Sequence, residues 1–302
     1  MAGHQKINKG FGAMPVKRLS FIKDLIINCF AKDAGLSSGF KKAIQSVAFL
    51  NFPGTVHLKS NKSRITGLSN CQSGALTYLK SATFSMMVLY FGRNNCFISI
   101  MNAQDQSIAE HIHTAKEGYH HVIAWFRELR AKGLNPLSVT IDGEHSVMRA
   151  IREVWPKAKL QRCLYHIQRE GMRWLRTFPK TQAGRELRAI LSALASVKSF
   201  KDRDVFMGLF HAWINAHYSF IKALPNSTIQ FKDLKKTVTL IKNALPDMFH
   251  YLENPNIPST TNALEGFYSR LKSDYQRHRG LSSKNRINYL NWYCWLKNST
   301  NF

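Results

Sequence analysis

The first residue whose context suggests chemistry is Asp142, in the stretch VTIDGEHSV. The apolar residues before it predict a short buried strand, and open α/β sheets place their ligands at the carboxyl ends of such strands. The carboxylate of Asp142 could bind Mg²⁺, a hard cation that prefers oxygen ligands. Asp142 could instead cap the next helix by accepting backbone N–H bonds, and Glu144 could offset the dipole of that helix. This stretch alone leaves both interpretations open.

A second acid, Glu265, lies in the stretch STTNALEGFYSRLKSDYQRHRG, which spans residues 259–280. The residues three and four positions away on either side carry no positive charge, so on a helix its carboxylate has no local partner. Glu265 could therefore face a metal ion. It also fits a capping box, in which Asn262 is the N-cap and Glu265 is the third helical residue.

A run of cations follows Glu265 within one segment. Its members are Arg270, Lys272, Arg277, His278, Arg279, Lys284 and Arg286. Such a run is usually a solvated face, but here it lies beside a candidate metal carboxylate. Two carboxylates that hold divalent metal next to a phosphate-binding surface are the arrangement used in two-metal phosphoryl transfer.

Cys163 and His166 form a C-x2-H pair in the stretch QRCLYHIQR. Because no second pair has a suitable spacing, they cannot make a closed four-ligand zinc site by themselves. A core thiol and a hydrogen-bonded histidine are the ordinary interpretation. The alternative is that Arg162 and His166 contact bases or position DNA. No P-loop, GxSxG or HExxH motif is present.

The net charge indicates the kind of partner. The 302 residues include 43 Lys and Arg against 18 Asp and Glu, which gives a net charge of +25. Nucleic acid is the commonest polyanion and is therefore the leading partner. We find no apolar run long enough to span a bilayer and no signal peptide, so no membrane is expected as a partner. Five scattered cysteines suit a reducing cytosol, and we expect a cytoplasmic, nucleoid-associated protein.

The elements that would position these residues follow an α/β pattern. Residues 74–104 read as strands, and SMMVLYF and CFISIM flank the turn GRNN as a β-hairpin. A helix over 106–132, a strand over 137–142, a helix that ends before Pro156 and a strand in AKLQRCLY follow. Residues 166–250 are predicted to be mostly helical. Further helices are expected over 262–278 and in LSSKNRINYLNWYCWLKN. This order predicts a mixed sheet with flanking helices.

Three separated motifs together resemble the Mutator-type DDE transposases of bacterial insertion sequences. They are VTIDGEHSVMRAIREVWPKAKLQRCLYHIQRE, ALPDMFHYLENPNIPSTTNALEGFYSRLK and HRGLS, and the resemblance covers about residues 86–302. It implies an RNase H-like fold with a large helical insertion before the last catalytic helix. It also implies three acids that bind two Mg²⁺ ions, which cut DNA strands and join their ends to a target.

Carried over to this chain, the resemblance makes Asp142 the second metal-binding catalytic acid and Glu265 the third. Cys163 and His166 match the C-x2-H pair of the family. The resemblance further implies that Asn262 and the cations after Glu265, among them Arg270, Lys272, Arg277 and Arg279, meet DNA.

The chain departs from the family pattern at the first acid. That acid is expected in a motif like Asp-x-Thr-Tyr, and GALTYLKSA has Thr77 and Tyr78 but Ala75 at about the position of the acid. No Asp or Glu occurs between Asp33 and Asp105, so none nearby can substitute. Loss of one of three metal carboxylates should remove much of the activity. The alternative to an active transposase is therefore a catalytically inactive DNA-binding relative.

The resulting prediction divides the chain into four parts. Residues 1–74 are a basic N-terminal region, 75–165 the first part of the RNase H-like core, 166–253 the helical insertion and 254–302 the C-terminal helices of the core. By resemblance, the partners are transposon ends and target DNA, and the chain acts as a homodimer or a larger synaptic assembly.

Overall fold

The computed structural model describes residues 82–278 and 280–299. Two compact units are distinguished, and each is described by itself. The sheet unit comprises, among the described residues, 82–177, 232–278 and 280–299; the helical unit comprises 178–231. The predicted N-terminal region 1–74, Ala75 with its neighbours, and Arg279 lie outside the described residues.

The sheet unit is built on a five-stranded mixed sheet in the order β3-β2-β1-β4-β5. The strands are β1 (Thr83–Tyr90), β2 (Cys96–Asn102), β3 (Ile108–Thr114), β4 (Ser138–Ile141) and β5 (Lys159–Arg162). The first three are antiparallel, whereas β4 and β5 continue the sheet in parallel with β1. The predicted hairpin is confirmed as β1 and β2, and the predicted RNase H-like α/β class is confirmed as well.

The helix predicted over 106–132 is wrong in its first part. Ile108–Thr114 is strand β3, and the helix α3 begins only at Tyr119 and ends at Ala131. The apolar pair Ile108 and Ile112 has a spacing of four, which fits a strand period of two as well as a helical period. Gly118 precedes the helix with a φ of 150°. The backbone of Ile108 is also fixed from outside, because the Asn298 side chain bonds both its N–H and its carbonyl group.

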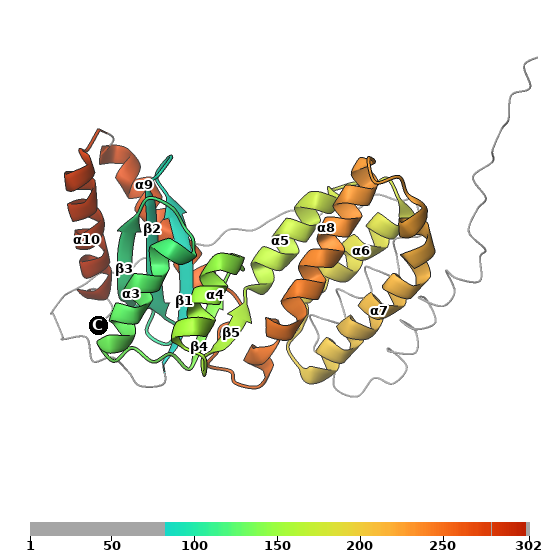
Figure 1. Ribbon diagram of the computed structural model, residues 1–302, viewed down its shortest axis with the longest axis horizontal. Helices are drawn as coiled ribbons and strands as arrows, with labels where there is room; N and C mark the ends of the chain where they lie inside the picture. Colours follow the sequence, from blue (N-terminus) through green and yellow to red (C-terminus); the bar gives the residue numbers. More distant parts are fainter. Residues whose placement is uncertain (1–81, 279, 300–302) are drawn as a thin grey trace, which may run out of the picture. The chain divides into compact units, whose positions relative to one another are not determined.

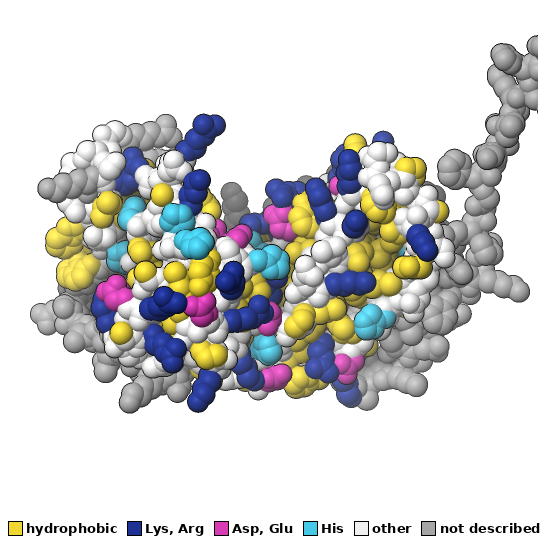
Figure 2. All heavy atoms as spheres, viewed as in Figure 1, with side chains coloured by type: hydrophobic (Ala, Val, Ile, Leu, Met, Phe, Trp, Pro, Cys, Tyr) yellow, Lys and Arg dark blue, Asp and Glu magenta, His cyan; other side chains and the backbone are white. Residues whose placement is uncertain are grey.

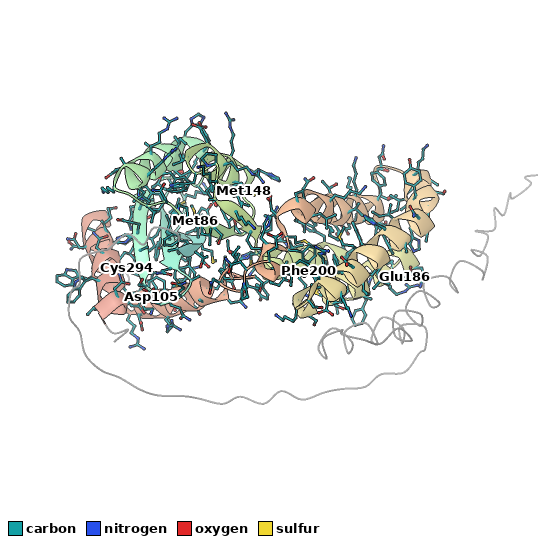
Figure 3. All side chains as sticks on the ribbon, turned by 90° about the horizontal axis from the view of Figure 1, so that it is seen from below. Met86, Asp105, Met148, Glu186, Phe200 and Cys294 are labelled. Atoms are coloured by element: carbon teal, nitrogen blue, oxygen red, sulfur yellow. The ribbon has the colours of Figure 1, made fainter. Side chains whose placement is uncertain are left out.

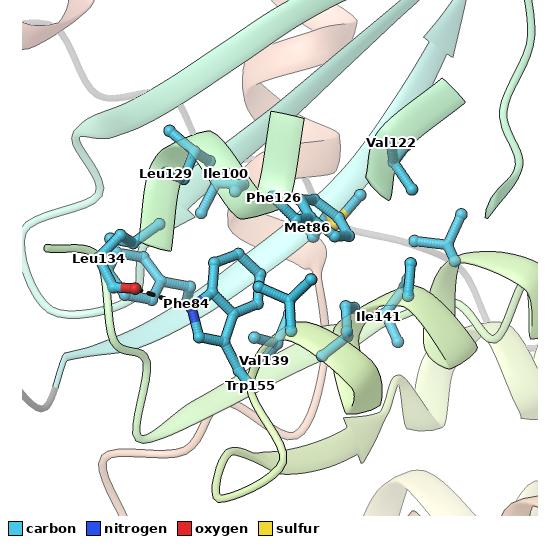
Figure 4. Close-up of a cluster of buried hydrophobic side chains, with 14 of the residues drawn as sticks. Phe84, Met86, Ile100, Val122, Phe126, Leu129, Leu134, Val139, Ile141 and Trp155 are labelled. Atoms are coloured by element: carbon cyan, nitrogen blue, oxygen red, sulfur yellow. Dashed lines mark hydrogen bonds between the residues drawn. The ribbon is translucent and has the colours of Figure 1, made fainter. Parts of the chain in front are cut away.

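One face of the sheet is covered by α3 and α4 (His145–Val154) (Figure 1). Buried side chains of these helices pack against those of β1, β2 and β4 that point to the same side, and Figure 4 shows this core. Trp155, just after α4, is 5% exposed and donates from Nε1 to the Leu134 carbonyl oxygen at 2.8 Å. A buried indole with its donor satisfied fixes the loop between α3 and β4.

The opposite face is covered by α9 (Asn262–Tyr275) and α10 (Ser283–Ser299). Figure 3 shows these two helices on the side of the sheet away from α3 and α4. Leu264, Phe267, Tyr268 and Leu271 of α9 are buried against Phe97 and other apolar side chains of the sheet. These four side chains form the apolar stripe that packs α9 against the sheet.

The segment 254–261, which leads into α9, is tied to several strands. The Thr83 hydroxyl of β1 donates to the Asn256 carbonyl oxygen at 2.8 Å. The Thr140 hydroxyl of β4 donates to the Pro258 carbonyl oxygen at 2.8 Å. Beyond β5, the Leu164 N–H donates to the Ser259 carbonyl oxygen at 2.9 Å. These bonds pair backbone carbonyl groups of a partly buried loop and hold it to the sheet.

The residues between β5 and α9 are mostly helical, as predicted. They form α5 (Leu164–Leu175), α6 (Gln182–Ser192), α7 (Phe200–Ala223) and α8 (Ile229–Ala244). Within the helical unit, Trp213 of α7 donates from Nε1 to the Ala183 carbonyl oxygen at 3.0 Å, and His217 Nε2 lies 2.6 Å from Glu186 Oε2. None of the helices in the described residues is long and apolar enough to cross a membrane.

Candidate active site

Asp142 lies at the carboxyl end of β4, as predicted, and is partly buried. The helix-cap alternative for this residue is wrong, because the N-cap of α4 is Glu144. The Glu144 side chain accepts from the Ser146 N–H at 3.4 Å and from its hydroxyl at 2.8 Å. Asp142 Oδ1 accepts from the N–H of Glu144, two residues on, at 3.3 Å. The capping function is thus carried by Glu144, and Asp142 is a loop carboxylate at the sheet end.

Arg162 fixes the loop that carries Asp142. Its side chain is almost fully buried, and its Nη2 donates to the Asp142 carbonyl oxygen at 3.3 Å. The guanidinium lies against Gly143, where a Cβ atom would come within 2.1 Å of Arg162 Cζ. Burial lowers the pKa of Arg162, and the charge of Asp142 opposes this effect. Arg162 therefore contacts the interior side of the loop, so its predicted DNA contact forms no part of our proposal.

Glu265 lies in the first turns of α9, but the capping box predicted for it is wrong. The N-cap is Thr261, Asn262 is the first helical residue and is exposed, and no side chain caps the helix. Glu265 Oε1 instead lies 3.3 Å from His166 Nε2 and 4.0 Å from Arg169 Nη1. Oε1 is buried and makes no hydrogen bond of good geometry with the described residues. His166 and Arg169 of α5, far away in the sequence, thus neighbour the acid that lacks a local partner.

Cys163 and His166 form the centre of a small polar network. His166 Nδ1 lies 3.2 Å from Cys163 Sγ, which also accepts from the Thr261 N–H at 3.3 Å. Burial opposes ionisation of Cys163, but its contacts with His166 and Thr261 together outweigh burial and lower the pKa of the thiol. Burial likewise acts to lower the pKa of His166, whereas Cys163 and the charge of Asp142 raise it. The network links the end of β5 to the start of α9.

Two of the cations predicted to meet DNA, Arg270 and Lys272, are exposed on the solvent side of α9, because the buried stripe of the helix faces the sheet. Arg277 is exposed in the short 3₁₀ helix Gln276–His278 that follows α9. Lys272 follows Glu265 by seven residues, or two helical turns, and so lies on the same side of α9. His166 is buried next to Glu265, so its predicted contact with DNA is not part of our proposal either.

Glu117 is a carboxylate near Asp142 that sequence reasoning missed. It accepts a hydrogen bond from the Tyr90 hydroxyl at 2.9 Å. Burial and, after it, the charge of Asp142 raise the pKa of Glu117 to about 7. A Cβ atom on the adjacent Gly118 would lie 3.7 Å from Ser146 Oγ, in the first turn of α4. The only sequence signal was a Glu-Gly pair, which the predicted helix over 106–132 concealed.

The residues present fit a divalent metal ion only in part. Carboxylate oxygens suit such an ion, and Asp142 and Glu265 are two candidates. Within residues 82–278 and 280–299, however, no three His, Cys, Asp or Glu residues are grouped so that they could hold a metal. A complete site is therefore not assembled from the described side chains, and no chemical step through a metal is derived below.

A mixed sheet in the order β3-β2-β1-β4-β5, with an acid after β4 and another on a covering helix, defines an RNase H-like protein. The model of the family described as "Transposase, Mutator family" matches residues 100–278, more than half of the chain. The chain belongs to the Mutator family of transposases. The family implies DNA as a partner and suggests a divalent metal cofactor. No curated protein matches the chain.

Proposed function

We propose that this chain binds transposon-end and target DNA and does not by itself carry out Mg²⁺-dependent strand cleavage and transfer. The observation that carries the proposal is that α9 bears both Glu265 and exposed cations, whereas the described residues supply two of the three expected acids and no complete metal-binding group. Asp142 and Glu265 are those two acids. The family match supplies the substrate class, and the incomplete set argues against independent catalysis.

The charge of the chain supports DNA binding. Figure 2 shows Lys and Arg side chains spread over the face in view, with fewer acidic side chains among them, and the whole chain has a net charge of +25. Phosphate neutralisation by such cations releases counterions and supplies most of non-specific affinity. Lys272 and Arg277 are the cations that we place closest to the DNA path beside Glu265.

The assembly and location follow from the same proposal. Transposon ends come in pairs, so a homodimer or a larger synaptic assembly would hold two ends together. A protein bound to chromosomal DNA would be cytoplasmic and associated with the nucleoid. The expected cofactor of a competent relative is Mg²⁺, since it binds oxygen ligands and substrate phosphates together.

A second candidate function, strand cleavage by this chain, is favoured by one observation. The charge of Asp142 adds to the effect of burial in raising the pKa of Glu117, which indicates that the two carboxylates are near each other. If Glu117 supplied a third carboxylate, the chain would cut DNA in Mg²⁺, and Glu117→Gln would abolish that cutting. Our proposal instead requires that Mg²⁺ promotes no cleavage of terminal-repeat DNA.

DNA binding is tested by its salt dependence. We expect log K to fall linearly with log salt, with a slope of about −0.9 for each phosphate neutralised. The double change Lys272→Ala with Arg277→Ala should make this slope shallower by about 2. The matched control removes two exposed lysines away from α9, Lys157 and Lys236, and should leave the slope nearly unchanged. If both double variants reduce the salt slope equally, Lys272 and Arg277 are not the DNA contacts. Salt-independent binding would refute the proposed function.

A further inference from the structure

The position of Glu265 over the sheet follows from the two ends of the segment that carries it. Thr261, at the start of α9, bonds to Cys163 directly after β5. Tyr268, about two turns later, donates from its hydroxyl to the Met87 carbonyl oxygen of β1 at 3.0 Å. In the sheet, β4 lies between β1 and β5. The helix therefore passes over β4 between these two contacts, and Glu265 lies between them, toward the end where Asp142 follows β4.

The β1 residue beside Asp142 follows from the strand register. β1 and β4 are parallel, and Ser85 pairs with Thr140. Extended by two residues, to the position directly after the end of β4, the same register places Met87 beside Asp142. Met87 is partly buried, so this position is neither deep in the core nor fully in solvent.

The alternation of side chains along a strand shows which face Met87 shares. Met86 and Ile141 both pack in the core beneath α3 and α4. Their successors Met87 and Asp142 therefore point to the opposite face. Met87 indeed packs against the cluster formed with α9 and α10. Met87, Asp142 and Glu265 thus belong to one face at one end of the sheet.

We infer that Met87 occupies the third ligand position of a divalent-cation site whose other ligands, Asp142 and Glu265, are retained, and that Met87→Asp completes it. A neutral thioether is a poor ligand for a hard cation, whereas a carboxylate is a good one. The inference rests on the proposed function. The sequence placed the missing acid near Ala75. The inference places it at Met87 instead, on strand β1, which pairs with β4.

The surroundings of Glu265 can compensate its negative charge without a bound cation. His166 and Arg169 lie 3.3 Å and 4.0 Å from its Oε1, so an imidazole and a positively charged guanidinium of the protein already neighbour the carboxylate. A chain that keeps these neighbours can lose one metal ligand without leaving Glu265 as an isolated charge in a partly buried place.

The experiment measures cation binding directly, in the full-length protein without DNA. Mn²⁺ is titrated and free Mn²⁺ is followed by electron paramagnetic resonance, with Mg²⁺ calorimetry in parallel. The variants are Met87→Asp, its uncharged counterpart Met87→Asn, and Met87→Asp combined with Asp142→Asn. We expect Met87→Asp to bind Mn²⁺ at least about 10-fold more tightly than the starting chain, since affinity rises with ligand charge. The uncharged variant should gain nothing, and Asp142→Asn should remove the gain.

Two results would overturn the inference. One is a gain in Met87→Asp that is absent or that survives loss of Asp142. The other is tight Mn²⁺ binding by the starting chain that Asp142→Asn or Glu117→Gln abolishes; this arm decides the matter even if Met87→Asp does not fold. DNA binding measured in EDTA is independent of both results, so failure of this inference is distinguishable from failure of the proposed function.

Discussion

The turn after Asp142 offers the sharpest test of the site geometry through Gly143→Ala. Gly143 has a φ of 110°. A residue with a Cβ atom is destabilised by about 1–2 kcal/mol in this conformation. The added Cβ atom would also lie 2.1 Å from Arg162 Cζ, and overpacking of this kind costs about 1–3 kcal/mol. The two effects together predict a loss of about 2–5 kcal/mol in the free energy of unfolding.

Two other glycines separate the contributions. Gly92 has a similar φ of 115° but open space around its Cβ position, so Gly92→Ala should lose only about 1–2 kcal/mol. Gly266, inside α9, would make only an ordinary contact at 3.7 Å with Arg270. Gly266→Ala should therefore be neutral or gain up to about 1 kcal/mol in helix propensity.

The assay is urea unfolding of each variant, followed by tryptophan fluorescence and far-UV circular dichroism. The steric part is isolated by repeating Gly143→Ala in an Arg162→Ala background, where the loss should shrink toward that of Gly92→Ala. A double-mutant cycle then gives a coupling energy of about 1–3 kcal/mol. The reasoning fails if Gly143→Ala costs no more than Gly92→Ala, or if the coupling energy is zero.

Two further predictions concern the sheet unit. The pKa of Glu117 is raised from 4.5 to about 7, so between these pH values the folded state binds more protons than the unfolded state, and stability falls as pH rises. Glu117→Gln should flatten this fall, measured as the unfolding free energy at several pH values between 4 and 8; parallel curves for the two proteins would contradict it. Trp155→Phe removes the donor to the buried Leu134 carbonyl group and should cost about 1–3 kcal/mol in urea unfolding. The control Trp295→Phe, at a position that is 43% exposed, should stay within about 0.5 kcal/mol, and equal losses would refute the assigned role.

Much of the architecture could be predicted from local patterns. The hairpin of β1 and β2, the strand before Asp142 and the helix that carries Glu265 all had signals within a few residues of themselves. Strand β3 did not, because isoleucines four apart satisfy two periods at once. Its identity is decided by pairing with β2 and by Asn298, which is 190 residues away in the sequence.

The elements that carry the two candidate acids could be predicted, but the environment of those acids could not. Local rules indicated that no charged side chain lies three or four positions from Glu265 on its own helix, which is correct. They could not reveal His166 and Arg169 as its neighbours, since these lie on α5. Local rules also placed caps at Asp142 and Asn262, whereas the structure caps one helix with Glu144 and leaves the other without a side-chain cap.

The position of the missing acid required the register of the sheet. Motif spacing pointed to Ala75, which is outside the described residues, because the sequence TY there imitates the family motif. Only the pairing of Ser85 with Thr140 identifies Met87. Parallel pairing between strands more than fifty residues apart leaves no trace in either strand alone.

The bonds that hold the segment 254–261 have a consequence for how this family could diversify. Asn256, Pro258 and Ser259 follow the helical unit in the sequence, and hydrogen bonds fix them to β1, β4 and the start of α5. The position of Glu265 is thus set by contacts made after the helical unit. Insertions, deletions or exchange of whole helices between 178 and 231 could therefore accumulate during evolution without moving the acid.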